Sequence, residues 1–300
     1  MNSPVIFLIY NRPKLTRRAF APIRAAKPRT LVVVADGPRA GDPRDAERCA
    51  TTRSIVESID WPCDLRIDFA DSNLGCTARV SSGITRALET FDRAVILEDD
   101  CVADPSFFRF ADEMLDRYAA DERIFSVTGD NFLFGRRVTP DSYFFSRYPY
   151  CWGWATWSRA WKHYDVAMRA WPQLRDGDFL ESGFDGDRSA IRYWRLVLDR
   201  TYSRVTDTWD FPWFFTCWMH HALTVVPETN LVTNIGFIRQ ATHTTMRMNA
   251  LGNIASQPLS FPLRHPEAVE RNDAADRHIE KRVFEHQRLL WLDRILSRKS

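Results

Sequence analysis

The chain has 300 residues, of which 45% are hydrophobic and 27% are charged, and its formal net charge is +2 at pH 7. These values are typical of a soluble globular protein with one domain and an appended subdomain, and so small a charge gives no reason to expect a nucleic-acid partner. No apolar run approaches the roughly 20 residues of a membrane helix, and the run at 4–10 is too short for a signal peptide.

Six cysteines occur without any C-x-x-C pair. This pattern predicts neither a zinc site nor a disulfide framework, and it favours a reducing cytoplasm.

The first 128 residues alternate predicted strands with predicted helices. Apolar runs bounded by turn residues predict strands at 4–10, 30–35, 65–69, 94–97 and 124–128. Helices are expected between them, at 15–26, 45–59, 77–91 and 105–119. This alternation is typical of a mostly parallel central sheet with helices on both faces, so the sequence predicts an α/β, Rossmann-like domain.

Polar residues follow four of these strands. In parallel sheets ligands bind beyond the carboxyl ends of the strands, so these residues should meet in one place. They are Asn11 and Arg12 after the first strand, Asp36 after the second, Asn73 with Arg79 after the third, and Glu98, Asp99 and Asp100 after the fourth. Four coincident polar strand ends favour a binding site.

Three consecutive acids, Glu98, Asp99 and Asp100, end the fourth strand. Carboxylates this close repel one another, and they persist with a bound cation, a nearby basic residue or a raised pKa. Hard oxygen ligands suit magnesium or manganese, which usually complete their shells with phosphate oxygens and water. Alternate strand residues face opposite ways, so the three acids cannot all bind one ion. The alternative interpretation is a solvated strand end.

Aromatic residues become frequent after residue 140. Short strands are expected at 143–146, 223–227 and 231–233, a helix at 191–204 and a mobile connection at 177–188. The run 148–161 gathers tryptophans around Gly153, among them Trp152 and Trp154. These rings either pack in the core or form a surface that stacks on a sugar.

Two further polar residues stand out in this half. Asp210 lies between Trp209 and Phe211, where desolvation would raise its pKa toward that of a general base. A hydrogen-bonded helix cap is the alternative role for it. His243 lies between threonines in the polar stretch 234–249, where it is either structural or a metal ligand.

A C-terminal extension, residues 246–300, carries an amphipathic helix expected at 267–296. The first part of this helix is charged and the later part is apolar. It therefore has three open roles: to close the core, to pair with another subunit, or to rest on a membrane surface.

Several segments together resemble a known family. The most specific is V-I-L-E-D-D-C-V-A-D-P-S-F-F-R-F at 95–110, and it is accompanied by N-R-P, A-D-G, N-L-G-C-T-A-R and a Trp-Asp pair. With these segments the chain resembles nucleotide-sugar glycosyltransferases of the GT-A fold, close to N-acetylglucosaminyltransferase I and to bacterial haemolysin-like glycosyltransferases. The resemblance covers residues 4–245, with a nucleotide-binding half at 1–130 and an acceptor half at 131–245.

The resemblance implies roles for the matching residues. It makes Asp100 the ligand of Mn²⁺ or Mg²⁺, with His243 closing the metal shell or clamping the diphosphate. It makes Asp210 the catalytic base, with Asp207 in reserve, because the relative has a double acid where this chain continues with an aromatic residue and a proline. Donor binding is expected of Tyr10, Asn11, Arg12, Asp36, Asn73, Arg79, Glu98 and Asp99, and acceptor or sugar binding of Trp152, Gly153, Trp154 and Trp209.

The implied activity is metal-dependent, inverting transfer of a sugar from a nucleotide diphosphate sugar to a hydroxyl of a glycan or lipid-linked acceptor. Asp36 would accept the imide N–H of uracil, which favours a UDP-sugar, although thymine presents the same edge. The expected setting is bacterial surface polysaccharide synthesis in the cytoplasm or on the inner membrane face. The alternatives are a non-catalytic glycan-binding or toxin-like protein and a sugar nucleotidyltransferase, which usually has a glycine-rich loop after its first strand.

Overall fold

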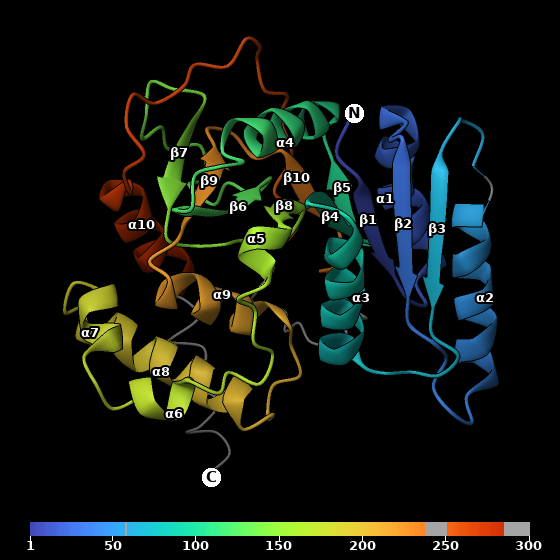
Figure 1. Ribbon diagram of the computed structural model, residues 1–300, viewed down its shortest axis with the longest axis horizontal. Coiled ribbons are helices and arrows are strands. Elements are labelled where there is room, and N and C mark those ends of the chain that lie inside the picture. The colour runs from blue at the N-terminus through green and yellow to red at the C-terminus, as the bar shows by residue number, and fades with distance from the viewer. Residues whose placement is uncertain (58, 238–250, 285–300) are drawn as a thin grey trace.

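The computed structural model describes residues 1–57, 59–237 and 251–284. Its centre is an eight-stranded sheet in the order β3-β2-β1-β4-β8-β6-β9-β7, and a second sheet pairs β10 with β5 (Figure 1). The strands are β1 (Val5–Ile9), β2 (Thr30–Ala35), β3 (Asp64–Phe69), β4 (Arg93–Glu98), β5 (Cys101–Ala103), β6 (Ile124–Thr128), β7 (Tyr143–Ser146), β8 (Trp154–Trp157), β9 (Leu223–Pro227) and β10 (Val232–Asn234).

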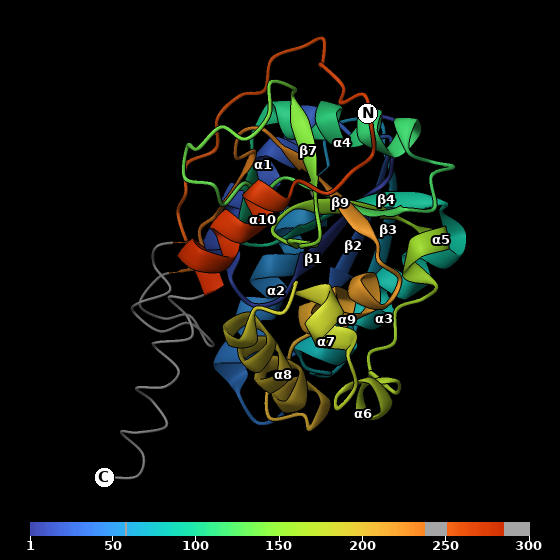
Figure 2. The same ribbon diagram turned by 90° about the vertical axis from the view of Figure 1, so that its left-hand side faces the viewer.

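Helices flank the sheet, and α6 to α9 gather at one end of the molecule in both views (Figures 1 and 2). The helices are α1 (Pro13–Ala26), α2 (Pro43–Glu57), α3 (Cys76–Thr90), α4 (Pro105–Arg117), α5 (Ser158–Trp161), α6 (Trp171–Leu174), α7 (Phe179–Gly183), α8 (Arg188–Tyr202), α9 (Asp210–Met219), α10 (Asp273–Ile279) and the π-helical turn η2 (Glu280–Phe284). Within the described ranges, no helix has the length and apolar character needed to cross a membrane.

The direction of the strands decides which loops share an edge. β3, β2, β1 and β4 pair in parallel, β8 runs antiparallel to both β4 and β6, and β9 is parallel to β6. Only β8 and β7 therefore run against the rest of this sheet, since β7 is antiparallel to β9. The predicted α/β class with a mostly parallel sheet is confirmed, and the carboxyl ends of β1 to β4 and of β6 lie at one edge.

Strands that are apolar on both faces divide the core into two layers. In β1, Phe7 faces α1, where its ring lies 5.9 Å from the ring of Phe20, and Ile6 faces the opposite layer with Ile84 of α3. Successive strand residues point to opposite faces, so a fully buried run such as V-I-F-L-I needs helices on both sides. This burial fixes the register of the strands and hence the position of the loops that follow them.

The elements predicted for the first 128 residues are confirmed, but along the described chain two strands, β5 and β8, and four helices, α5, α6, α7 and α9, were missed. β5 has three residues and comes directly after the acids, and β8 lies within the tryptophan run at 148–161. α9 lies within a second run of aromatic residues, 208–222. The connection predicted as mobile at 177–188 contains α7, and its Leu180 and Phe184 are buried in the core. Aromatic packing, which depends on the tertiary fold, decides these elements.

The described part of the C-terminal extension, residues 251–284, packs on the rest of the chain. Its backbone bonds to Asn234 through Asn253 and to β7 through Asn272, whose amide donates to the Phe145 carbonyl at 2.8 Å. The helix begins at Asp273 rather than at 267, because residues up to 272 run beside β7 and Asn272 then caps the helix by accepting from the Ala275 amide. The predicted start was therefore wrong, and the later apolar part, 285–296, lies outside the described residues.

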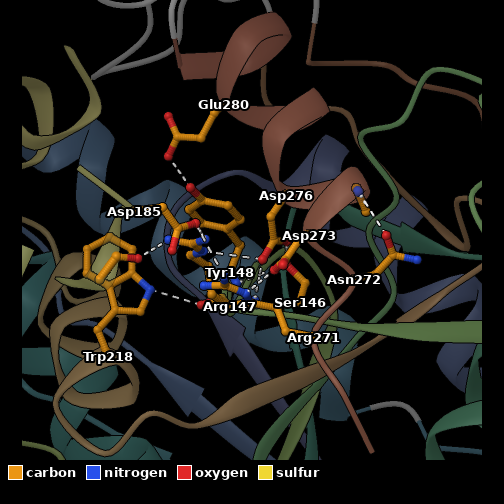
Figure 3. Close-up of polar contacts among 12 residues, drawn as sticks. Ser146, Arg147, Tyr148, Asp185, Trp218, Arg271, Asn272, Asp273, Asp276 and Glu280 are labelled. Carbon is orange, nitrogen blue, oxygen red and sulfur yellow. Dashed lines mark hydrogen bonds and ion pairs between the residues drawn. The ribbon is translucent and has the colours of Figure 1, made fainter. Parts of the chain in front are cut away.

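A buried polar network anchors α10 to the end of β7 (Figure 3). Asp276, which is 1% exposed, accepts from the Ser146 hydroxyl at 2.6 Å and pairs with Arg147 at 3.3 Å. One turn later, Glu280 accepts from the Tyr148 hydroxyl. The extension up to residue 284 is therefore part of the same core.

Candidate active site

An arginine joins two of the three acids at the carboxyl edge of the sheet. Arg12, which follows β1, donates from Nη1 to Asp100 at 2.9 Å and from Nε and Nη2 to both oxygens of Asp99. Asp99 and Asp100 are buried, whereas 38% of the Arg12 side chain is exposed. Since β1 and β4 are neighbours, the predicted meeting of their carboxyl ends is observed.

The second sheet holds the acids in place. β5 follows Asp100 directly and pairs with β10, and the Ile235 amide donates to the Asp100 carbonyl at 2.8 Å. Gly236 lies so close that a Cβ added to it would stand 2.2 Å from Oδ2 of Asp100. Only glycine leaves this carboxylate its position.

Glu98 is half-buried at the end of β4, where the charges of Asp99, Asp100 and Arg12 act on its carboxyl group. Burial and then the charge of Asp100 raise the pKa of Glu98 to about 8, while Arg12 acts in the opposite direction. The charge of Asp210, which is remote in sequence, adds to this rise in the pKa of Glu98. A cation bound beside Glu98 would favour the ionised carboxylate and lower this raised pKa.

Asp210 stands in the first turn of α9 with one oxygen held and the other open. Oδ1 accepts from the Phe211 amide at 2.9 Å and from the Thr208 hydroxyl. Within the described chain Oδ2 has no hydrogen bond. Desolvation raises the pKa of Asp210 although both of these hydrogen bonds lower it. Asp210 is the first residue of α9 and not its cap, because Trp209 holds the N-cap position and makes no side-chain cap hydrogen bond. Its role as a base stays a prediction.

Asp207, the reserve base, precedes α9, is exposed, and contacts the start of α3. Its Oδ1 accepts from the Thr77 amide at 3.3 Å, and a Cβ added at Gly75 would lie 3.5 Å from Oδ2. Because it accepts from an amide in the first turn of α3, Asp207 has a structural role. Asp210 is the better placed of the two.

Asp36 is already saturated by the protein. Its oxygens accept from the Gly37 and Leu74 amides at 2.8 and 2.9 Å and from the Asn73 side chain and Gly75 amide at 2.9 and 3.1 Å. An ionised carboxylate offers about four lone-pair sites, so none is left to read a nucleobase. Asp36 and Asn73 hold the loop before α3, which corrects the role that the resemblance implied for Asp36.

Arg79 is also used internally. It is 3% exposed, donates to the Ala35 carbonyl at 3.0 Å, and pairs with Asp68 at 2.9 Å. Its guanidinium ties β2 to β3 and α3, so it is not free to neutralise phosphate charge. The exposed cation at this edge that contacts the acids is Arg12.

A residue that sequence reasoning missed holds the end of β1. Asp45, in the first turn of α2, accepts from the Tyr10 hydroxyl at 2.7 Å, from the Asn11 side-chain amide and from the Arg39 backbone amide at 2.8 Å. It is completely buried. In sequence it looked like an ordinary acid at a helix start, and only its enclosure by the two neighbouring loops reveals its role.

The tryptophans divide between core and surface. Trp154 is fully buried with its ring 5.6 Å from that of Trp209, which is 3% exposed, so neither has a face for a sugar. Gly153 has φ +75° and lies against Val232, where a Cβ would stand 2.6 Å away. Trp152 is half-buried and packs edge to face on Phe132. The predicted sugar-stacking role is therefore wrong for Trp154 and Trp209, and Trp152 is the candidate that is left of these three.

Asp130 supports Trp152 from beneath and is a second acid that sequence reasoning missed. It follows β6, is 1% exposed, and accepts from the Trp152 amide at 3.0 Å. Its Oδ1 has no hydrogen-bond partner among the described residues. Burial raises the pKa of Asp130 well above its ordinary value.

The donor atoms at this edge fit one kind of metal site. Among the described residues, no three His, Cys, Asp or Glu side chains are arranged to enclose an ion. Arg12 contacts both oxygens of Asp99 but only Oδ2 of Asp100, so Oδ1 of Asp100 is the carboxylate oxygen of this pair that Arg12 leaves free. A single carboxylate, completed by substrate phosphates and water, is a usual arrangement for Mg²⁺ and similar ions. His243, the other predicted ligand, lies outside the described residues.

No family model matches the chain, and no curated protein matches it in sequence. Among solved structures, the galactosyltransferase LgtC in complex with donor and acceptor sugar analogues is 12% identical, with a TM-score of 0.36 over 58% of this chain and 65% of LgtC. Mouse xyloside xylosyltransferase 1 is 10% identical, with a TM-score of 0.35 over 72% of this chain and 81% of that protein.

UDP-glucose pyrophosphorylase complexed with UDP-glucose is 12% identical, with a TM-score of 0.28 over 49% of this chain and 62% of that protein. The chain spans less than two thirds of the length of LgtC. Likenesses this distant carry no argument about activity, and the geometry of the site is the basis for assigning one.

Proposed function

We propose that this chain is a metal-dependent, inverting glycosyltransferase. In this proposal it moves a hexosyl or N-acetylhexosaminyl group from a nucleotide diphosphate sugar, first of all a UDP-sugar, to a hydroxyl group of a glycan or lipid-linked acceptor. The observation that carries the proposal is the contact of Arg12 with Asp99 and Asp100 at the carboxyl edge of one parallel sheet, directly after Glu98. The family resemblance of these same segments is the second support.

Each group has a distinct task. Asp210, with one carboxylate oxygen open, takes the proton of the acceptor hydroxyl as that oxygen attacks the anomeric carbon. The bond from the anomeric carbon to the diphosphate oxygen breaks, and the nucleoside diphosphate leaves. Arg12 faces this site with a partly exposed guanidinium, which can stabilise the charge of the leaving group. A single displacement of this kind inverts the anomeric centre.

Asp100 would hold Mg²⁺ or Mn²⁺ in this scheme. When bound, the ion supplies a positive charge that neutralises the diphosphate. Glu98, whose ionisation is opposed by Asp100, would contact the donor sugar. Trp152, which is half-buried, would contact the acceptor or the sugar.

The setting is part of the same proposal. All six cysteines are free thiols, which is compatible with a cytoplasmic enzyme. A role in bacterial surface polysaccharide synthesis, and a contact of the C-terminal helix with a membrane or a second subunit, remain predictions. The apolar part of that helix lies outside the described residues.

Calorimetry with UDP and with nucleotide sugars, with and without Mn²⁺, tests the proposal. We expect metal-dependent binding, and mass spectrometry of the reaction should detect transfer or slow hydrolysis of a sugar nucleotide. Asp100→Ala should abolish turnover while leaving the circular dichroism spectrum unchanged. Asp116→Ala is the matched control, because Asp116 is an exposed acid that pairs with Arg93 at the opposite end of β4.

Three outcomes would contradict the proposal. Full activity of Asp100→Ala would remove the metal assignment. Glycan binding without any nucleotide binding would favour the glycan-binding alternative. Formation of a nucleoside triphosphate from a sugar nucleotide and pyrophosphate would instead identify a nucleotidyltransferase.

A further inference from the structure

Asp45 connects the loops that follow β1 and β2. Its Oδ2 accepts from the Tyr10 hydroxyl and the Arg39 amide, and its Oδ1 accepts from the Asn11 side chain, with the Arg39 guanidinium 3.8 Å away. No part of the Asp45 side chain is exposed, whereas Tyr10 and Asn11 are half-buried and reach the surface. The acid therefore acts on a ligand only through these neighbours.

The charge state of Asp45 fixes what it can do. Burial alone would raise the pKa of Asp45, but the hydrogen bonds from Arg39, Tyr10 and Asn11 outweigh burial and leave its pKa below the ordinary value. Asp45 is therefore ionised at neutral pH, and an ionised carboxylate accepts hydrogen bonds without donating any. Each group that faces it must be a donor.

This requirement orients the Asn11 amide. The nitrogen must face Asp45, so the Asn11 oxygen must point away from it. That oxygen accepts no hydrogen bond within the described chain. The orientation follows from the chemistry of Asp45, since an ionised carboxylate can only accept. Asn11 immediately precedes Arg12, so it lies on the same loop as the arginine that contacts the acids.

We propose that Asp45 is a positioning residue. It presents the side-chain amide oxygen of Asn11 as the acceptor for a nucleobase N–H and so selects uracil over cytosine. The inference rests on the proposed use of a nucleotide sugar. It replaces Asp36, whose oxygens already accept four protein hydrogen bonds. Uracil presents the N3–H as a donor between two carbonyl groups. Cytosine presents N3 as an acceptor, and two facing acceptors repel.

The test compares the binding of UDP and CDP to wild-type protein and to three variants by calorimetry with Mn²⁺. Wild-type protein should bind UDP more tightly than CDP. Asn11→Ala removes the acceptor and should reduce this preference about tenfold. Asp45→Asn frees the Asn11 amide to turn over, because an amide at position 45 can both donate and accept, and it should reduce the preference similarly.

Asp42→Asn is the matched control. Asp42 accepts from the Arg44 and Asp45 amides at the start of α2, in the same loop, without contacting Asn11. Its UDP to CDP ratio should equal that of wild type. The ratio of the UDP and CDP affinities is the decisive readout, because a merely structural role for Asp45 would weaken the binding of both nucleotides to the same extent. Asn11→Ala keeps the test open if Asp45→Asn fails to fold.

The outcomes separate the inference from the proposed function. If wild-type protein prefers UDP, and Asn11→Ala or a folded Asp45→Asn keeps the full preference, the inference is overturned while the proposed function stands. If wild-type protein binds both nucleotides equally, the inference is also overturned. If it binds neither, the proposed function itself fails and the inference fails with it.

Discussion

Two arginines, in different halves of the molecule, each pair with two carboxylates and yet meet different surroundings. Arg12 pairs with Asp99 and Asp100 at the sheet edge, and 38% of its side chain is exposed. Arg147 pairs with Asp276 and Asp185 beneath α10, and 10% of its side chain is exposed. The first group is open to a ligand, whereas the second is closed by the chain itself. Similar ion pairs thus form a candidate site in one half and a structural anchor in the other.

The largest expected effect is on catalysis in the open region. Asp210→Asn removes the base and should lower kcat by about 10²–10⁴-fold, because an amide cannot take the acceptor proton. The side chain keeps an oxygen for the Phe211 amide, so α9 and donor binding should be preserved. Steady-state kinetics and UDP calorimetry measure the two effects separately.

Asp207→Asn is the comparison for this variant. Asp207 is exposed and bonds the Thr77 amide, so its change should leave kcat close to that of wild type. A large loss of kcat in Asp207→Asn with an active Asp210→Asn would exchange the roles of the two acids.

Two tryptophans near each other in sequence should differ sharply in their effect on stability. Trp154→Ala empties a fully buried site against Trp209 and Trp213 and should cost about 3–5 kcal/mol of unfolding free energy. Trp152→Ala removes a half-buried ring and should cost clearly less. If Trp152 contacts the acceptor, its loss should raise the KM for acceptor. Urea unfolding and kinetics check both, and equal costs in stability would show that Trp152 is a core residue too.

The two arginines give the next contrast. Arg147→Ala leaves Asp276 buried without its cation and should cost about 3 kcal/mol or more. Arg12→Ala likewise leaves the buried Asp99 without its cation and should cost a similar amount of stability, but it should in addition greatly weaken UDP binding, which Arg147→Ala should not. Urea unfolding and calorimetry on both variants measure the contrast. Retained UDP binding in Arg12→Ala would place the leaving group elsewhere.

The fold of the nucleotide-binding half could be predicted from the sequence because its strands are apolar on both faces and its turns are punctuated by polar residues. β2, for example, was predicted at its observed bounds. The same logic placed Arg12 beside Asp100, since neighbouring parallel strands end at one edge. Local pattern and tertiary packing agree there.

The rest depends on contacts between residues far apart in the sequence. Nothing in the sequence links Asp45 to Asn11, 34 residues away, or shows that loop amides would saturate Asp36. A run of tryptophans predicts burial in general, but which ring is inside follows from the pairing of β8 with β4 and β6. Hydrogen-bond saturation and enclosure arise only when the loops are packed together.

The last contrast concerns the pH dependence of stability and Asp130, a buried acid that, unlike those beside Arg12 and Arg147, has no cationic partner in the described chain. Burial raises its folded pKa above the unfolded value of about 3.9, so the folded state binds more protons than the unfolded state above that pH. The stability that the neutral acid contributes is fully present below pH of about 3.9 and is lost as pH rises toward the folded pKa, by up to about 1.4 kcal/mol per pH unit.

Asp130→Asn should remove this loss, because an amide stays neutral and still accepts from the Trp152 amide. The variant should therefore gain stability relative to wild type as pH rises from 4 to 8, and urea unfolding across that range measures the gain. Asp116→Asn, an exposed control, should show a far weaker trend. A stability difference between Asp130→Asn and wild type that stays constant with pH would mean that Asp130 is ionised in the folded protein. A cation, from solvent or from a ligand, would then have to lie beside its unpartnered Oδ1.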